Sequence, residues 1–188
     1  MSIRDTRRGE RSRAGRQLEI LRLGLMNGEV NGMTPKEALR ECQAFCRLTD
    51  DKLEKIAALS SEQVFEAGAT IFQAGSMAEQ IFVLMQGKVA LQMEAPMGQL
   101  QLRKRVTLDT IGNSELFGWS GIVEPYIYTL SAICLRTSIV LSIDARKLSS
   151  LLQEDCPIAY EVLQGLAVVI SSRLHDTMQL LVTERSLA

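Results

Sequence analysis

The residues of this chain with the clearest chemical potential lie in one short segment, residues 117–128. It holds four of the chain's nine aromatic residues: Phe117, Trp119, Tyr126 and Tyr128. Aromatic rings supply large stacking surfaces, and the tyrosine hydroxyls add hydrogen-bonding groups. Such a composition favours a pocket for a neutral or weakly charged planar ligand. The alternative is that the rings themselves fill the pocket and nothing binds.

The charge around this segment disfavours an anionic ligand. Residues 114–128 contain Glu115 and Glu124 but no lysine or arginine, a local net charge of −2. An anion bound there lacks a charged hydrogen bond worth about 1.5–3 kcal/mol, or about one to two decades of affinity. Neighbouring strands offer four candidate cations: Arg103, Lys104, Arg105 and Arg136. Because side chains alternate along a strand, only some of the four are expected to point inward.

Other chemistries find little support. His175 is the only histidine, so a metal site built from several histidines is excluded, and an exposed helix position is favoured over an axial haem ligand. Cys42 and Cys46 lie one turn apart on an expected amphipathic helix, which indicates two small packing residues rather than an iron–sulfur site. No serine–histidine–acid set, phosphate-binding loop or dinucleotide fingerprint is present. We therefore expect a protein that is not an enzyme.

Helix signals flank the aromatic segment on both sides. On the N-terminal side, residues 34–37 combine a capping threonine, a first-turn proline and a capping-box glutamate. Thr49 offers the cap of a second helix. On the C-terminal side, Asp144 caps a short helix, and Pro157 opens a long one that runs to about residue 183.

Between these helices the hydrophobic period changes from 3.6 to 2, which indicates strands. They are expected at residues 63–65, 70–72, 80–85, 89–93, 99–108, 128–135 and 138–143. Glycines punctuate the runs at spacings that suit tight turns: Gly68, Gly75, Gly87 and Gly98. Many short strands with glycine turns predict a small sandwich or barrel, so the fold class is α+β and mainly β.

The last helix carries an apolar stripe that is too broad for a small barrel to cover. We therefore predict a dimer interface along it, formed by Leu163, Leu166, Ile170, Leu174 and Met178. Packing of the whole stripe against the chain's own domain is the alternative.

Four segments carry a recognisable pattern. Residues 65–75 hold two glycine turns, and residues 81–89 place a Gly-Lys turn after a buried strand. Residues 111–119 lead into the aromatic segment, and residues 128–132 lead out of it. In this order they resemble the cyclic-nucleotide-binding domain of the catabolite-activator (Crp/Fnr-type) superfamily, over about residues 35–183. The resemblance implies a double-stranded β-helix, or jelly roll, with N-terminal helices and a long C-terminal helix.

The resemblance also implies that the aromatic segment is the cassette that holds the ligand. The implied ligand-binding residues are Phe117, Gly118, Trp119, Ser120, Gly121, Ile122, Tyr126 and Tyr128. In the family pattern a glutamate follows Phe-Gly and an arginine follows the later proline. Here Trp119 and Tyr126 stand at those positions. No cofactor is firmly predicted, and the candidate ligands are a cyclic nucleotide or a neutral planar molecule.

The chain is expected to divide into a tail and one domain. Residues 1–33 are predicted to be a basic, partly disordered tail, since the first sixteen residues hold six arginines against Asp5 and Glu10. The domain is expected at 34–188, with helices at 34–60, a β-roll at 61–143 and C-terminal helices at 144–184. The net charge of −1 gives no overall attraction to nucleic acid or acidic lipid.

These features predict a regulatory homodimer that senses a small-molecule ligand and signals through its C-terminal helices to a protein partner. The alternative is a ligand-free protein-interaction module on the same fold. Without a signal peptide or an apolar run of about 20 residues, we expect a cytoplasmic protein with no membrane span and no structural disulfide. Five residues after position 183 are too few for a helix-turn-helix domain, so sequence-specific DNA binding by this chain is not expected.

Overall fold

The computed structural model describes residues 33–97 and 102–186. The chain divides into two units, residues 1–34 and 35–188, and the architecture below is that of the second. The predicted basic tail lies almost wholly outside the described residues, and so does the predicted turn at Gly98.

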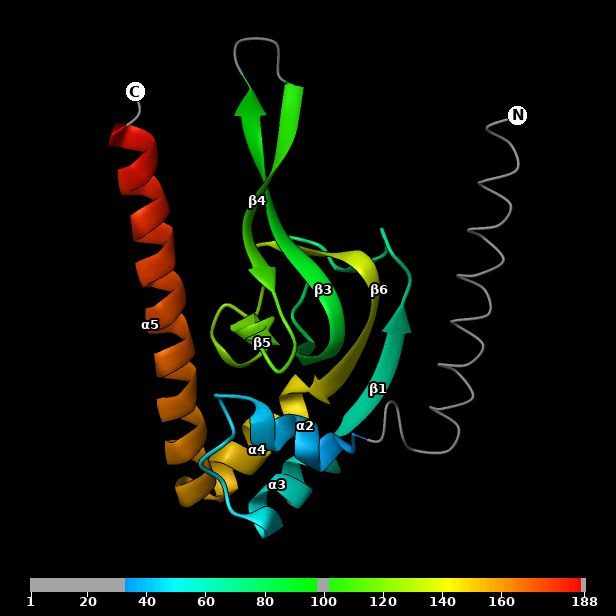
Figure 1. The fold of residues 1–188 in the computed structure, drawn as a ribbon. Helices are drawn as coiled ribbons and strands as arrows, with labels where there is room; N and C mark the ends of the chain where they lie inside the picture. Colours follow the sequence, from blue (N-terminus) through cyan, green and yellow to red (C-terminus); the bar gives the residue numbers. More distant parts are fainter. Residues whose placement is uncertain (1–32, 98–101, 187–188) are drawn as a thin grey trace, which may run out of the picture. The chain divides into compact units, whose positions relative to one another are not determined.

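The centre of this unit is an antiparallel sheet built on two long strands, β3 (Gln80–Met97) and β6 (Ser131–Asp144), which pair with each other (Figure 1). The strands β1 (Ser60–Phe65) and β2 (Thr70–Phe72) pair with β6. The strands β4 (Leu102–Ile111) and β5 (Leu116–Phe117) pair with β3. The main path through the sheet is β1–β6–β3–β4, and the predicted jelly roll is confirmed.

Two pairs of predicted strands each form one longer strand. The strands predicted at 80–85 and 89–93 both lie in β3, and those predicted at 128–135 and 138–143 join in β6. Gly87 was expected to form a turn, but it lies inside β3, where the register shifts bend the strand without reversing it. Its φ of 127° suits glycine, and a Cβ there would lie 2.6 Å from the Cβ of Ser138. The strand predicted from Tyr128 begins only at Ser131, because residues 128–130 form the loop that leads into β6.

The four α-helices begin within a residue of the predicted positions, although the predicted cap Thr49 makes no side-chain cap hydrogen bond. A short 3₁₀ helix was not predicted. The helices are α2 (Pro35–Glu41), α3 (Asp50–Ala57), α4 (Ala145–Glu154), α5 (Cys156–Ser186) and the short 3₁₀ helix η2 (Trp119–Ile122). The cap at Asp144 is confirmed, since its carboxylate accepts a hydrogen bond of 2.9 Å from the backbone N–H of Lys147. Among the described residues, no helix is long and apolar enough to cross a membrane.

The first helix is shorter than predicted. It ends at Glu41, and tight turns follow over residues 42–47, with the N–H of Phe45 donating to the carbonyl of Cys42. Cys42 is therefore buried and Cys46 exposed, instead of both packing in the core. Burial raises the pKa of the Cys42 thiol to about 12. All four cysteines are free.

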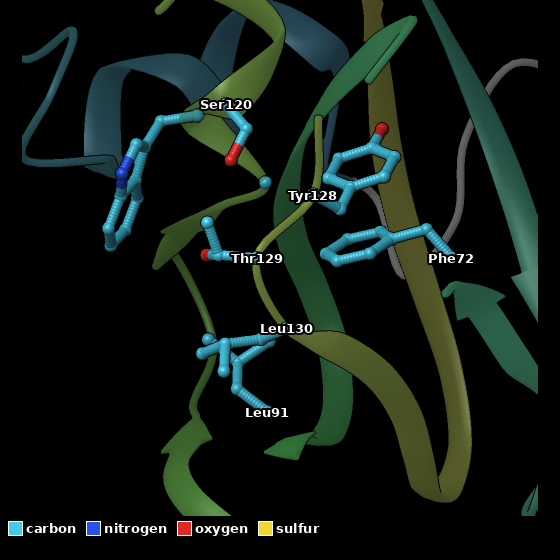
Figure 2. A pocket seen from close by; sticks show the side chains of 8 residues that line it. Phe72, Leu91, Ser120, Tyr128, Thr129 and Leu130 are labelled. Carbon is cyan, nitrogen blue, oxygen red and sulfur yellow. The ribbon is translucent and has the colours of Figure 1, made fainter. Parts of the chain in front are cut away.

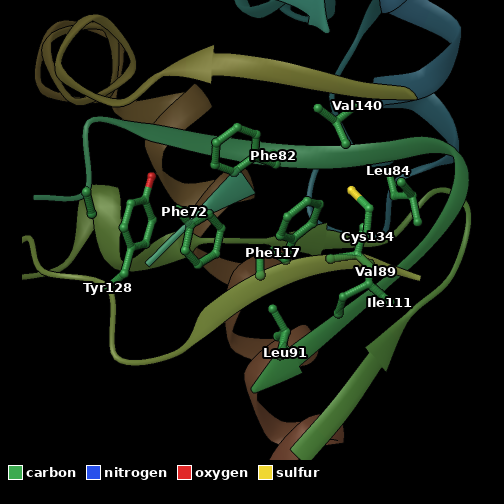
Figure 3. Close-up of a cluster of buried hydrophobic side chains, with 12 residues drawn as sticks. Phe72, Phe82, Leu84, Val89, Leu91, Ile111, Phe117, Tyr128, Cys134 and Val140 are labelled. Carbon is green, nitrogen blue, oxygen red and sulfur yellow. The ribbon is translucent and has the colours of Figure 1, made fainter. Parts of the chain in front are cut away.

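The interior of the roll is an aromatic core (Figure 3). The rings of Phe72 and Tyr128 stack with centroids 3.8 Å apart, and those of Phe82 and Phe117 stack at 5.2 Å. These rings come from β2, β3, β5 and the loop before β6. The core thus ties the aromatic segment to three strands and fixes where its chain leaves the sheet.

Candidate ligand-binding site

The aromatic segment turns sharply out of the sheet at Gly118. Its φ of 74° is in the left-handed region, which glycine adopts without a steric penalty. A Cβ at this position would also approach the rings of Phe82 and Phe72 to 3.1 and 3.3 Å. The turn leads directly into η2, so Trp119 and Ser120 are placed over the edge of the aromatic core.

A small cavity lies under this turn (Figure 2). Its volume is about 40 Å³, and it is lined by Phe72, Leu91, Gly118, Trp119, Ser120, Tyr128, Thr129 and Leu130. None of these lining residues carries a charge. The cavity is much smaller than the roughly 300–1,000 Å³ of typical small-molecule sites. Ligand entry therefore requires part of the wall to move.

The predicted ligand-binding residues separate into three groups. Four of them line this cavity: Gly118, Trp119, Ser120 and Tyr128. Gly121 and Tyr126 line a second cavity instead, and Ile122 lines neither. Phe117 also lines neither cavity, because its side chain is fully buried in the aromatic core.

Sequence reasoning missed four of the lining residues: Phe72, Leu91, Thr129 and Leu130. Phe72 and Leu91 belong to β2 and β3, and strand alternation could have marked them as inward-facing. Which inward residues border the cavity depends on how the sheet curls. The sequence does not show this.

Tyr128 is a wall of the cavity rather than a free hydrogen-bonding group. Its side chain is 5% exposed, and its hydroxyl donates a hydrogen bond of 2.7 Å to the backbone carbonyl of Gln80. Burial raises the pKa of this tyrosine. The Tyr128 hydroxyl, which was expected to bind the ligand, is therefore already hydrogen-bonded within the fold.

Arg173 of α5, which the sequence did not point to, makes three contacts beside the cassette. Its guanidinium lies 4.7 Å from the centroid of the Trp119 ring. Nη2 donates to the carbonyl of Leu116 at 2.6 Å, and Nε lies 3.2 Å from a carboxylate oxygen of Asp109. Burial lowers the pKa of Arg173, and the charges of Asp109 and Glu115 oppose that shift. The residue thus connects α5 to β4, β5 and η2.

Two of the four cations suggested by the sequence, Arg105 and Arg136, supply no charge to the cavity. Arg136 donates to the carbonyl of Gly87 at 2.7 Å, and Arg105 lies 3.9 Å from Glu94 on an exposed strand face. Neither lines the cavity. The side chains of Arg103 and Lys104 lie outside the described residues.

The second cavity is larger, about 290 Å³. It lies between the segment before β3, the loop after η2 and α4, and its lining residues are Met77, Ala78, Glu79, Gly121, Tyr126, Arg146 and Ser149. Tyr126 and Trp119, which the resemblance places on one ligand, therefore border two different cavities.

The predicted dimer residues differ in their exposure. Leu163, Ile170, Leu174 and Met178 are exposed on α5, at 54%, 38%, 54% and 54%. Leu166 is 4% exposed, so it packs against its own domain and is not available to a second chain. The remaining four stay a prediction of an interface.

His175 is an exposed residue of α5, and its Nε2 lies 2.8 Å from Nε2 of Gln179. Within the part of the chain that the structure describes, no group of three or more histidine, cysteine, aspartate or glutamate residues could hold a metal ion.

The jelly roll and its short helical cassette have counterparts among known regulatory proteins. Residues 62–155, half of the chain, match the cyclic nucleotide-binding domain family. Over 120 residues the chain is 27% identical to the CRP-like cAMP-activated global transcriptional regulator of Mycobacterium tuberculosis, which covers 64% of this chain and 51% of that protein. The chain thus spans about half the length of the curated relatives it matches.

Solved structures agree with this match. One is a Geobacter metallireducens protein described as cyclic nucleotide-binding, at 28% identity and a TM-score of 0.66, covering 76% of this chain and 100% of that chain. Another is the N-terminal domain of a Streptomyces coelicolor transcriptional regulator, at 25% identity and a TM-score of 0.61, covering 75% of this chain and 94% of that chain. This chain belongs to the cyclic nucleotide-binding domain family.

Proposed function

We propose that this domain is a non-enzymatic regulatory sensor whose cassette binds a neutral or weakly charged planar ligand. The observation that carries the proposal is the lining of the cassette cavity, which offers rings, apolar groups and two aliphatic hydroxyls but no charge. Cyclic AMP and cyclic GMP carry a phosphate, which needs a cation or several amide donors in a half-buried site. Arg173 contacts the Trp119 ring but does not line the cavity, and its Nε is paired with Asp109.

The same geometry supports a route by which ligand binding reaches α5. The cavity of about 40 Å³ is too small for a planar ligand as it stands, so a wall residue must move. Trp119 is the wall residue that contacts Arg173, and Arg173 in turn holds α5 against Leu116 and Asp109. Displacing the indole therefore weakens one of the contacts that position α5. A protein partner that binds α5 would then respond to ligand binding in the cassette.

The exposed apolar residues of α5 support a homodimer as the signalling form: Leu163, Ile170, Leu174 and Met178. In such a dimer, a shift of α5 in one copy is transmitted directly to the other.

A second candidate function is a ligand-free docking module. The small volume of the cassette cavity favours this function, because aromatic rings that fill a site leave no space for a ligand. In that case the roll surface serves only to hold a protein partner.

The test uses Trp119, the chain's only tryptophan, as a fluorescent probe in the full chain. Adenosine and cAMP form a matched pair, since they share the planar base and only cAMP carries the charged phosphate. We expect adenosine to give a saturable change and cAMP to bind no more tightly. Calorimetry with Trp119→Ala should then show that adenosine binding is lost.

Two outcomes contradict the proposal. If cAMP or cGMP binds about tenfold or more tightly than the nucleoside, a cation from outside the cassette neutralises the phosphate and the ligand is a cyclic nucleotide. If neither molecule binds up to about 1 mM, and Trp119→Ala lowers stability without affecting partner capture, the docking module is supported instead.

A further inference from the structure

The second cavity is a better-formed pocket than the one in the cassette. Its volume of about 290 Å³ is close to the lower limit of about 300 Å³ for small-molecule sites. It borders the outer side of η2 and the start of α4, and no lining residue is shared with the cassette cavity. It is therefore a separate candidate site.

The walls of this cavity are held by backbone contacts. The N–H of Ala78 donates to the carbonyl of Tyr126 at 2.8 Å, and the N–H of Ala145 donates to the carbonyl of Glu79 at 3.0 Å. Gly121 packs so closely on α4 that a Cβ would lie 2.8 Å from the Cβ of Ala145. The three segments thus form the cavity without a ligand, which favours a preorganised site.

The aromatic wall of the cavity is held in an unusual backbone conformation. Tyr126 has a φ of 59°, a region that residues other than glycine rarely adopt. Its side chain remains 42% exposed, and within the described part of the chain its hydroxyl makes no hydrogen bond. Residues held in such backbone conformations cluster at active sites and ligand-binding sites.

The cavity is lined by two side chains of opposite charge that do not form an ion pair with each other. They belong to Glu79 and Arg146. Their side chains also form no hydrogen bond or ion pair with any other described residue. A guanidinium is suited to a bidentate carboxylate, and a carboxylate is suited to an ammonium group. An anion such as a phosphate would instead face the charge of Glu79.

We propose that this cavity binds a small zwitterion, a molecule with one carboxylate and one ammonium group, such as a free amino acid. Arg146 receives the carboxylate and Glu79 the ammonium. The apolar part lies against Met77 and Tyr126, and Ser149 adds a hydroxyl at the rim. The proposal is independent of what the cassette binds.

The test is calorimetric titration of the full chain with the standard L-amino acids, one at a time, up to about 10 mM. We expect at least one to bind saturably. For the tightest binder, the amide lacks the carboxylate and the N-acetyl derivative lacks the ammonium, and each should bind about tenfold or more weakly.

Two charge-neutralising variants locate the site. Arg146→Gln and Glu79→Gln should each weaken binding of that amino acid about tenfold or more, since each removes one charged partner. Both side chains are exposed, so the variants are expected to fold, which circular dichroism checks. Arg105→Gln is the matched control, an exposed arginine outside the cavity, and should bind as the parent chain does.

The proposal is overturned if no amino acid binds by 10 mM, or if binding is unchanged in both Arg146→Gln and Glu79→Gln. The cassette is followed separately through Trp119 fluorescence with adenosine. A missing response there, with amino-acid binding intact, counts only against the cassette proposal.

Discussion

At the residue scale, the contact between Trp119 and Arg173 connects the cassette to α5. The family pattern has a glutamate at the position of Trp119. An indole ring therefore stands where the pattern places a hydrogen-bond-accepting carboxylate. That ring meets a guanidinium 4.7 Å away, on a helix more than fifty residues later in the chain. Because Arg173 also binds Asp109 and the carbonyl of Leu116, it links α5 to the roll, while its Nη1 is buried without a hydrogen-bond partner among the described residues.

Replacing this arginine should loosen the link. Arg173→Gln removes the ion pair with Asp109, the cation–π contact and one hydrogen bond. We expect the free energy of unfolding to fall by about 1–3 kcal/mol and the Trp119 emission to shift to the red. Chemical denaturation and fluorescence measure both effects. Arg105→Gln, at an exposed ion pair, is the control and should change neither. Unaltered emission in Arg173→Gln would contradict the link.

Glu62 of β1 should make stability depend on pH. Burial raises the pKa of this glutamate above its ordinary value of 4.5, and its Oε2 is buried without a hydrogen-bond partner among the described residues. A raised pKa in the folded state means that folding favours the protonated form. The contribution of Glu62 to stability is therefore full below pH 4.5 and is lost as the pH rises through the folded pKa.

Glu62→Gln should remove this loss. We expect the variant to gain stability relative to the parent chain as the pH is raised from below 4.5 to neutrality. Urea denaturation over that pH range measures the difference between the two chains. A difference that stays constant with pH would show that burial of Glu62 does not disfavour its charge.

At the element scale, α5 is positioned by close backbone packing as well as by Arg173. Gly165 lies where α5 crosses the turn after α2, and a Cβ there would lie 2.8 Å from the carbonyl carbon of Ala44. A helical glycine normally costs stability relative to alanine. Here its missing side chain is what allows the close approach of the two backbones.

Gly165→Ala tests that packing. The added methyl group meets backbone atoms, so α5 or the turn must shift, and we expect a loss of about 1–3 kcal/mol despite the better helix propensity of alanine. Ser171→Ala, at an exposed position of the same helix, is the matched control and should be neutral or slightly stabilising. Thermal unfolding compares the two. A stabilised Gly165→Ala would mean that the two backbones lie farther apart.

At the scale of the whole molecule, the dimer proposal depends on how much of the α5 stripe the domain itself covers. Val162, Leu166 and Val169 are buried within it. Leu163, Leu174 and Met178 are more than half exposed. One face of α5 thus completes the domain core, and the other is exposed.

A charge on the exposed face should separate the copies. Leu174→Asp places a carboxylate in the proposed interface, and we expect a monomer where the parent chain sediments as a dimer, since an unpaired charge is costly to bury. Leu135→Asp, at a similarly exposed leucine of β6, is the control and should leave the dimer intact. A monomeric parent chain in analytical ultracentrifugation would exclude the interface.

Local patterns in the sequence determined the element types and the family. The starts of α2, α4 and α5 coincide with the predicted prolines and the Asp144 cap, and the jelly roll follows from period-2 runs with glycines between them. These features depend on neighbours within a few residues, so they are visible in the chain. Gly87 in β3 shows the limit of such prediction from sequence, because a glycine occurs both at turns between strands and at bends within one strand.

The tertiary structure decided which of the candidate residues act together. Phe117 is in the core, Trp119 and Tyr126 border different cavities, and Leu166 packs within its own domain. Arg173 reaches Trp119 only because α5 returns along the roll. Such contacts join residues far apart in the sequence, and their geometry depends on strand register and sheet curvature. No periodicity within one segment carries that information.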